Sequence, residues 1–398
     1  MTDHFDNSVW PCRLKPKPDE VLSSWLVRQS AGLFVKLQTF TTRHLELGAN
    51  FWTTDVDRCI NPQVFSRLSE HLNVPLSVAT QTSLSAHAGN LWEQLHTGPL
   101  AYITCVGKVG RKRVSFGQQY CRLCLADDAE PYFRKSWRLA FNVYCSLHDI
   151  YLRDCCPSCK KPVVFHSGDF GKVFMPATCQ ITVCQQCQSD FRVSPFDDDI
   201  EASNEIKLIQ SWLHGCLQDG FGTIDDRNVY PALLIFSGVR KLISTYTSAT
   251  RLSRIAAGLR QSYGVLDLYS PSIQQSYFET LRIGDRVCAL LSLYQLLDDW
   301  PNTLVRACTE NRISSSYLNY YRGDTPYWLW KELHWHLNDQ DYAPSAEEVR
   351  SVKHYLLLKQ LPDSKSDINA LLGTSAITAK RKSRKQRWNP RGSLNYRS

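Results

Sequence analysis

The chain has 398 residues, 43% of them hydrophobic, which is enough for two to four structural units with cores of their own. Charged residues interrupt every apolar run within about 18 residues, and the first ten residues lack the basic and apolar regions of a secretory signal, so we expect a protein of the cell interior without a membrane span. The net charge of +8 is a property of the C-terminus, because eight of the 46 basic residues and none of the 38 acidic residues lie at or after Lys380.

In chain order, residues 1–100 are predicted to form a helical N-terminal domain. Its first helix opens at Asp19-Glu20 and has Arg28 behind an apolar face made of Val21, Leu22, Trp25 and Leu26. A second helix is predicted over residues 62–72, and a shorter one follows the turn at 73–75 and runs to about Leu84. Two short helices joined by a tight turn are typical of a helix-turn-helix, and equally of two helices that simply pack together.

Residues 101–195 are predicted to form a tandem zinc-binding module. Fifteen cysteines would be unusual as disulfides in a reducing cytosol, and seven of them, with one histidine, occur as four pairs separated by two residues. The pairs are Cys121 and Cys124, Cys145 and His148, Cys156 and Cys159, and Cys184 and Cys187. Zn²⁺ binds four such ligands in a tetrahedron. The spacing therefore predicts two consecutive sites, one Cys₃His and one Cys₄, with two Zn²⁺ per chain.

All four positions of each predicted site are filled by side chains, so we expect structural rather than catalytic zinc. A redox Cys-x-x-Cys pair would not explain the other three pairs, and an iron–sulfur cluster would not usually recruit a histidine. The ligand choice leaves one alternative open, because Cys155 or Cys179 lies close enough in sequence to replace Cys156 or Cys184.

This region contains three further features. An aromatic and basic segment between the first two pairs is either a surface for nucleic acid or a partner or, at least for Trp137, part of a small core. That segment contains Tyr132, Arg134, Trp137 and Arg138. The basic loop at 107–113 is interpreted as solvated, with phosphate contact as the alternative, and His166 is interpreted as a bystander rather than a ligand.

Residues 196–343 are predicted to form a helical domain that serves mainly as scaffold. Its clearest helix ends at Trp300-Pro301 and has an apolar stripe of Ile283, Val287, Leu290, Leu291, Tyr294 and Leu297. The acidic groups at 197–199 and 298–299 are interpreted as helix caps or solvated side chains, because adjacent carboxylates point in different directions. The sequence also lacks a phosphate-binding Gly-rich loop and a nucleophile motif, so we expect no enzymatic activity.

Residues 344–398 are predicted to form a candidate helix-turn-helix with a basic tail. Ser345 and Glu348 form a capping box, Gly373 closes a short helix, and another helix begins near Ser375. The alternative is a disordered basic tail that follows two helices. Such a cluster of positive charge points to a polyanionic partner. The candidate nucleic-acid contacts are Lys380, Arg381, Lys382, Arg384, Lys385, Arg387 and Arg391, and Arg397 is the eighth cation.

These motifs resemble those of the TniQ/TnsD family. The resemblance covers residues 10 to 190, and Arg122 departs from it, since the family often has proline there. It rests on Tyr120–Cys124, Pro131–Arg134, Trp137–Leu139, Cys145 with His148, Cys156–Cys159, and an N-terminal motif of Pro16–Glu20, Ser23–Leu26 and Arg28, with Asp299–Pro301 as a weaker match.

The resemblance implies a non-catalytic selector of target sites for transposition in the bacterial cytoplasm. Such a protein recruits the transposition machinery to a DNA site, either by binding DNA directly or by docking on an RNA-guided CRISPR complex. The implied partners are DNA, an ATPase regulator and a transposase, and a homodimer is left open. The alternative function is a zinc-containing sequence-specific transcription regulator that reads DNA with the C-terminal helix-turn-helix.

Overall fold

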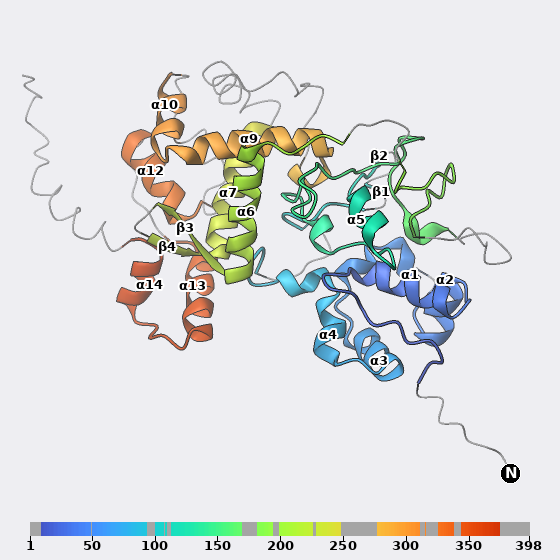
Figure 1. The fold of residues 1–398 in the computed structure, drawn as a ribbon. Coiled ribbons are helices and arrows are strands. Elements are labelled where there is room, and N and C mark those ends of the chain that lie inside the picture. The colour runs from blue at the N-terminus through green and yellow to red at the C-terminus, as the bar shows by residue number, and fades with distance from the viewer. Residues whose placement is uncertain are drawn as a thin grey trace, which may run out of the picture.

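The computed structural model describes most of the chain, and it is mainly helical, as predicted. The described residues are 9–48, 50–93, 100–106, 108–109, 113–168, 181–193, 199–225, 228–247, 277–310, 315, 325–337 and 344–374. In Figure 1 the N-terminal helices lie at the lower right beneath the cysteine-rich segment, and the later helices form the left half.

The N-terminal region consists of short helices. They are α1 (Leu22–Gly32), α2 (Leu37–Thr39), a π-helical turn (Phe40–His44), α3 (Pro62–Leu72) and α4 (Leu76–Gln81), with 3₁₀ turns at Phe51–Thr53, Val56–Arg58 and Leu84–His87. The prediction for α3 is confirmed in full: the Asn61 side chain accepts the Gln63 N–H, and Asn73 ends the helix in the left-handed region. The next helix stops at Gln81, before the predicted end near Leu84.

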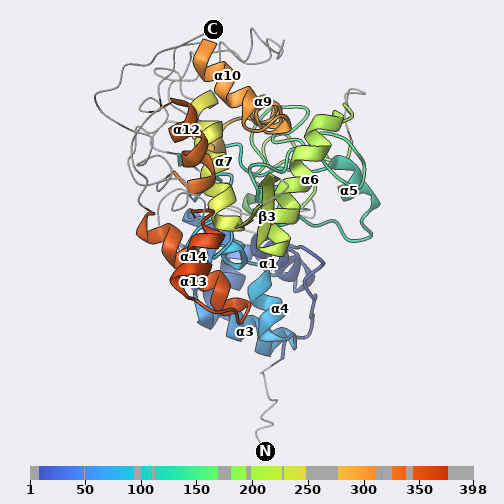
Figure 2. The same cartoon turned by 90° about the vertical axis from the view of Figure 1, so that its left-hand side faces the viewer.

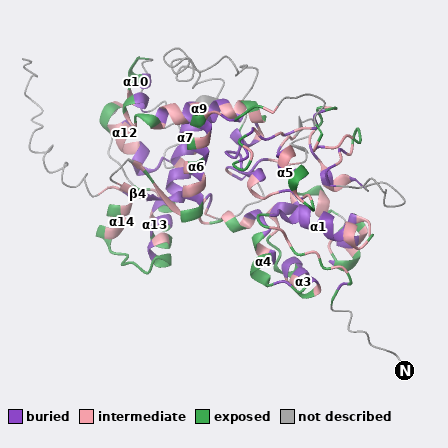
Figure 3. Cartoon of the chain, in the orientation of Figure 1, coloured by how far each residue is buried: buried purple, intermediate pink, exposed green. Residues whose placement is uncertain are grey.

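The helix α1 is buried on all sides rather than on one face. Residues 22–30 are all buried, and they include Arg28, which was expected behind the apolar face (Figure 3). A helix that is buried all round needs partners for its polar side chains, and these are described below with the site.

The cysteine-rich segment has little regular structure. It contains β1 (Lys108–Val109) paired antiparallel with β2 (Arg113–Val114), the short helix α5 (Arg122–Asp127), and 3₁₀ turns at Ser136–Arg138 and Phe165–Ser167. Isolated bridges such as Tyr120 to Arg153 hold its loops together. A segment with so few ladder hydrogen bonds depends on other cross-links for a fixed structure.

The helical half is built on α6, α7 and α9, which pack on one another (Figure 1). Its elements are α6 (Asn204–Asp219), β3 (Phe221–Asp225), β4 (Asn228–Pro231), α7 (Ala232–Thr247), a 3₁₀ turn (Phe278–Thr280), α9 (Ile283–Asp298), α10 (Asn302–Glu310) and α12 (Tyr327–Leu337). The strands β3 and β4 form an antiparallel hairpin. Asp299 lies between α9 and α10 and accepts a hydrogen bond from the Asn302 side chain.

The predicted apolar stripe of α9 was only partly right. The helix ends at Asp298, next to the predicted stop, and Leu290 is fully buried. The deeply buried side is formed instead by Arg286, Cys288, Ala289, Leu290, Ser292, Leu293 and Leu296, while the other stripe residues are half-buried against the same core. Neighbouring elements therefore cover α9 on more than one side, which a single stripe does not anticipate.

The C-terminal pair of helices, α13 (Ala346–Leu358) and α14 (Lys365–Leu371), packs together beside the β3–β4 hairpin, as Figure 2 shows. The predicted capping box of Ser345 and Glu348 is confirmed, and Gly373 ends α14 with φ 73°. The third helix of the candidate helix-turn-helix would begin near Ser375, outside the described residues, so that motif stays a prediction.

The buried apolar residues form two large clusters and a small one. The first extends from Trp10 to Phe191 and joins the N-terminal helices to the cysteine-rich segment. The second extends from Leu84 to Leu333 and joins residues 100–144 to the helical half. Each of these two clusters contains residues from both sides of the predicted boundary between residues 100 and 101. The division into four domains stays a prediction. Within the described part of the chain, no helix has both the length and the apolarity needed to cross a membrane.

Candidate metal centre

Three of the four Cys-x-x-Cys or Cys-x-x-His pairs form the same backbone turn. After Cys145, Cys156 and Cys184, the residue four positions later donates its N–H to the cysteine carbonyl at 2.8, 3.0 and 2.9 Å. Each of these cysteines in turn donates its own N–H, at 2.8 Å, to the carbonyl five positions later. The turn requires a left-handed residue at the fourth position, and Asp149, Lys160 and Gln188 have φ of 56°, 57° and 63°.

The first pair is built differently, at the start of a helix. Cys121 is the N-cap of α5, and its Sγ accepts the N–H of Cys124 at 3.5 Å. Cys124 lies in the first turn of the same helix, so both sulfur atoms of this pair are at its N-terminus.

The first cluster brings together Cys121, Cys124, Cys145 and His148. The Nδ1 atom of His148 lies 3.6, 3.4 and 3.5 Å from the three sulfur atoms, and the Sγ atoms of Cys124 and Cys145 are 3.5 Å apart. A tetrahedron with metal–ligand bonds of about 2.0–2.3 Å has edges of about 3.3–3.8 Å. These four atoms therefore have the separations that a tetrahedral metal ion requires.

The second cluster brings together Cys156, Cys159, Cys184 and Cys187. The Sγ atoms of Cys156 and Cys187 are 3.5 Å apart, and those of Cys159 and Cys184 are 3.7 Å apart. In both clusters the ligand atoms all lie within 4.8 Å of one another. The two clusters could thus each hold one metal ion, and their thiolate and imidazole donors suit Zn²⁺.

Burial matches this chemistry. Cys121, Cys124, Cys145, Cys156 and Cys184 are buried. Burial raises the pKa of the Cys156 thiol to about 12 and also raises the pKa of the Cys184 thiol. Buried thiols of this kind become thiolates when a cation is beside them, so metal binding releases protons.

A carboxylate outside the cluster orients the histidine. The Asp127 Oδ2 lies 2.9 Å from His148 Nε2, which leaves Nδ1 to face the three sulfur atoms. Sequence reasoning missed Asp127. Its position three residues after Cys124 on a helix was a usable signal, because residues three apart share one helix face.

The N-terminal motif that supported the family resemblance anchors α1 to the segment between the first two pairs. Glu20 is buried and accepts hydrogen bonds from Ser24 Oγ at 2.8 Å and Arg28 Nη1 at 2.6 Å. Arg28 also reaches Glu130 at 2.8 Å. In addition, the Phe133 N–H donates to Ser24 Oγ at 3.0 Å. The motif therefore forms an interface inside the molecule.

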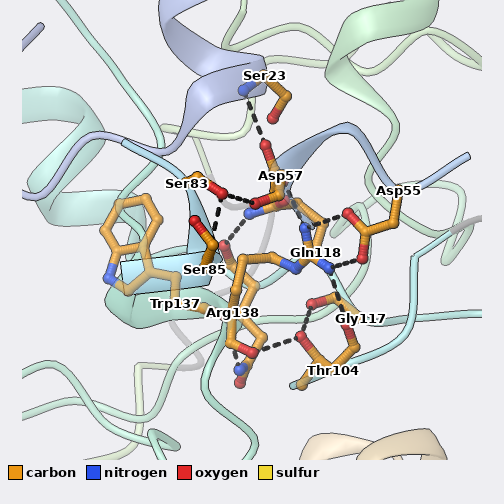
Figure 4. Close-up of polar contacts among 11 residues, drawn as sticks. Ser23, Asp55, Asp57, Ser83, Ser85, Thr104, Gly117, Gln118, Trp137 and Arg138 are labelled. Atoms are coloured by element: carbon orange, nitrogen blue, oxygen red, sulfur yellow. Dashed lines mark hydrogen bonds and ion pairs between the residues drawn. The ribbon is translucent and has the colours of Figure 1, made fainter. Parts of the chain in front are cut away.

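A second polar network, drawn in Figure 4, places Arg138 at a junction of three segments. Its guanidinium contacts Asp57 at 2.5 Å and Asp55 at 2.6 Å, and donates to the Thr104 carbonyl at 2.9 Å. Asp57 also accepts the N–H of Ser23 in α1 at 2.8 Å. Both carboxylates border a cavity of about 280 Å³, and Arg138 pairs with both of them. The network therefore joins segments rather than forming an acid–base site.

The alternative that residues 132–138 form an exposed contact surface was wrong. Trp137 is 2% exposed, as expected for a core residue, and Arg138 is fully buried. Arg134 stacks over the rings of Tyr132 and Trp137 at 4.5 and 4.8 Å and pairs with Asp128. Arg134 and Arg138 have acidic partners inside the protein, which sequence spacing cannot reveal.

The departure from the family pattern at Arg122 has a structural counterpart. Arg122 Nε donates to Asp199 Oδ1 at 2.8 Å, and Arg153 reaches the same oxygen at 3.0 Å. Asp199 belongs to the acidic group at 197–199, whose other two residues lie outside the described part of the chain. An ion pair across the module thus occurs where family members often have a rigid proline.

The remaining candidates are placed as follows. Cys155 lies beside the second cluster without belonging to it, and His166 stacks on Trp52 with ring centroids 5.3 Å apart. Cys179 lies outside the described residues, and so do residues 107 and 110–112 of the basic loop at 107–113. For the rest of that loop the structure describes the backbone. The seven candidate nucleic-acid contacts from Lys380 to Arg391 lie outside the described residues as well.

The fold and the clusters together define a mainly helical protein with a tandem metal-knuckle module. Residues 11–152 match the family model TniQ, so this part of the chain is a TniQ domain. No curated protein matches the chain. A TniQ domain implies a role in target selection for transposition, and proteins of this family are non-catalytic adaptors that interact with DNA and the transposition machinery.

Proposed function

We propose that this protein is a target-site selector that recruits the transposition machinery to a DNA site and performs no chemistry itself. The observation that carries the proposal is the TniQ match over residues 11–152, which ends just beyond the first metal cluster. The N-terminal motif and that cluster share one core, which supports a rigid adaptor platform.

Two Zn²⁺ ions stabilise this platform. The ligands are the eight side chains of the two clusters, and the ions act structurally because protein atoms supply all four donors at each site. Structural zinc of this kind contributes about 10–16 kcal/mol of binding free energy in knuckle peptides, so the module depends on it for folding.

Direct binding to DNA through the basic C-terminal segment is the mode of recruitment that charge supports. Residues 1–379 carry equal numbers of acidic and basic side chains, so the whole positive excess lies in the segment from Lys380 onward. Counterion release from phosphates then drives binding that weakens steeply with salt. Docking on an RNA-guided CRISPR complex is the second mode, and a transcription regulator is the alternative function.

The test measures binding of the full-length, zinc-loaded protein to a duplex of mixed sequence at several salt concentrations. Substituting Arg384, Lys385 and Arg387 by glutamine should lower the log–log salt slope by about 0.9 for each lost phosphate contact. The matched control substitutes three exposed cations elsewhere, Arg13, Lys15 and Lys161, and should leave the slope unchanged. Equal slopes in both variants would refute DNA binding by the tail.

A pull-down with a transposition ATPase or CRISPR proteins encoded by neighbouring genes separates direct DNA binding, docking on a CRISPR complex and transcription regulation. A selector that docks on a CRISPR complex binds that complex without duplex affinity of its own. A transcription regulator binds a defined duplex and captures neither the ATPase nor the complex.

A further inference from the structure

Three large aliphatic side chains are exposed around the first metal cluster. Leu147, between Cys145 and His148, is 73% exposed, Ile200 is 67% exposed, and Leu208 on α6 is 58% exposed. Single exposed aliphatics are normal, but groups of them on one surface mark interaction sites. We refer to these three residues as the knuckle–α6 patch.

Backbone pairing and one ion pair bring together the three segments that carry these residues. The segment that follows Leu147 pairs antiparallel with the segment that contains Ile200: the Tyr151 N–H donates to the Ile200 carbonyl at 3.0 Å, and the Ala202 N–H donates to the Asp149 carbonyl at 2.8 Å. On α6, Lys207 adjoins Leu208 and its Nζ reaches Asp149 at 3.1 Å. The knuckle, the strand-like segment and the start of α6 are therefore neighbours.

The rim of the patch is acidic. Asp149, Glu201 and Asp127 have side chains that are 55%, 77% and 70% exposed, and Glu205 in the first turn of α6 is exposed too. Lys207 is shared between Asp149 and Glu201, while Arg122 and Arg153 are both paired with Asp199, next to Ile200. An apolar surface with this rim fits a basic segment that also carries apolar side chains, and it repels nucleic acid.

The chain itself contains such a segment. Residues 380–398 carry eight cations, no acidic residue, and the apolar side chains of Trp388, Leu394 and Tyr396. The remaining 379 residues have no net charge, so the positive charge of the tail and the negative charge around the patch are each concentrated in one place.

The geometry allows the contact within one molecule. A Cβ at Gly373 would lie 3.4 Å from the Tyr230 hydroxyl, and Tyr230 pairs with Gly222, three residues beyond the end of α6. Eleven residues of helix separate Asp219 from Leu208, a rise of about 17 Å. Ten residues of extended chain after Thr374 span up to about 33–36 Å, so Arg384 and the residues after it can reach the patch.

We propose that the knuckle–α6 patch is the docking surface for residues 380–398 of the same chain, and that DNA competes with the patch for this segment. The inference about competition rests on the proposed function, whereas the docking contact does not. While the tail is docked on the patch, it does not bind the phosphates of non-target DNA. It is released when a DNA site attracts its cations more strongly than the acidic rim does.

The experiment measures how fast trypsin cleaves the tail of the full-length, zinc-loaded protein, by mass spectrometry at short digestion times. The patch variant carries Ile200→Ser and Leu208→Ser, both at exposed positions and away from the metal ligands. We expect its tail to be cleaved about tenfold faster than that of the unaltered protein, equivalent to about 1.4 kcal/mol. The control carries Leu357→Ser and Leu358→Ser on α13, which are 75% and 67% exposed, and should not change the rate.

Equal cleavage rates in all three proteins would overturn the proposal, and so would an equal acceleration in the control. Protection that grows with protein concentration would instead assign the tail to a second copy and overturn docking within one chain. Salt slopes that do not depend on the tail cations would contradict the proposed DNA contact, while the cleavage comparison would still decide the docking contact. With DNA binding intact, the patch variant should bind the duplex more tightly than the unaltered protein.

Discussion

At the scale of single residues, the turn that ends α1 places a large side chain where glycine is favoured. Phe34 has φ 54° and donates its N–H to the Ala31 carbonyl at 3.0 Å, while Val35 donates to the Ser30 carbonyl. This is the position after a helix at which glycine usually adopts the left-handed conformation. The Phe34 side chain is also 88% exposed, so the residue carries backbone strain and gains little packing.

We predict that Phe34→Gly raises the free energy of unfolding by about 0.5–1 kcal/mol. The left-handed conformation costs a non-glycine residue about 1–2 kcal/mol, and the greater chain entropy of glycine in the unfolded state offsets part of that gain. Chemical denaturation measures the change, with Phe34→Ala as the control that keeps the strain. A destabilised glycine variant would mean that the ring makes contacts that this argument ignores.

Substituting single cysteines distinguishes a metal ligand from a neighbouring cysteine that is not a ligand. We predict that Cys156→Ser lowers the zinc content of the purified protein from two ions to about one per chain, because one thiolate of the Cys₄ set is lost. Cys155→Ser should keep both ions, since its side chain lies outside the cluster. Metal analysis of the two variants measures this directly, and the opposite result would place Cys155 in the site.

His166 should make stability depend on pH. Burial lowers its pKa to about 4, while Asp55 and Arg138 act on it in opposite directions. The unfolded chain therefore binds this proton near pH 6.5 and the folded chain only near pH 4, so its contribution is complete above pH 6.5 and is lost as the pH falls toward 4. His166→Phe should flatten the fall in unfolding free energy over that window, and an unchanged slope would contradict the burial of a neutral ring.

At the scale of elements, α1 is held by charge as well as by apolar packing. Its Arg28 lies between buried Glu20, with a fully covered side chain, and Glu130, whose side chain is 52% exposed. The same guanidinium thus makes one ion pair in the interior and one at the surface, so the contributions of a buried and an exposed ion pair to stability can be compared on one arginine.

We predict that Glu20→Ala destabilises the protein by about 3 kcal/mol, because it leaves buried donors of Arg28, Ser24 and the Lys17 backbone without their acceptor. Glu130→Ala should cost about 1 kcal/mol or less, as exposed ion pairs contribute little. Denaturant unfolding of both variants checks the ranking, and equal losses would remove the distinction between the two pairs.

At the scale of the whole molecule, the metal clusters belong to a core that they share with the N-terminal helices. Cys121, Cys124, Cys145, Cys156 and Cys184 belong to the same buried cluster as Trp25 and Leu68. The other large core, centred on α6, α7 and α9, includes residues between 100 and 144 but none of the metal ligands. Metal loss should therefore spread toward the N-terminus more than toward the helical half.

We predict that removing zinc with a strong chelator increases amide hydrogen exchange in residues 121–187 and in α1, while α9 stays largely protected. The buried Trp25 and Trp137 become exposed, so tryptophan fluorescence should shift to longer wavelength. Exchange in α1 that is unaffected by verified metal removal would show that the N-terminal helices fold independently of the clusters.

Local sequence patterns were sufficient for the features that depend on near neighbours. The helix α3, the capping box at Ser345, the end of α14 at Gly373 and the four metal-ligand pairs all follow from residues a few positions apart. Caps, turns and Cys-x-x-Cys pairs are short-range structures, and their geometry is set by the residues within them.

Only the tertiary structure decided which polar residues are internal. Arg28, Arg138 and Arg286 are buried because segments far apart in sequence supply their partners, and the deeply buried side of α9 is set by what packs against it. An isolated charge in the sequence is expected at the surface, because burial without a partner is costly. Pairs such as Arg138 with Asp55 and Asp57 are more than 80 residues apart, so they become visible only in the folded chain.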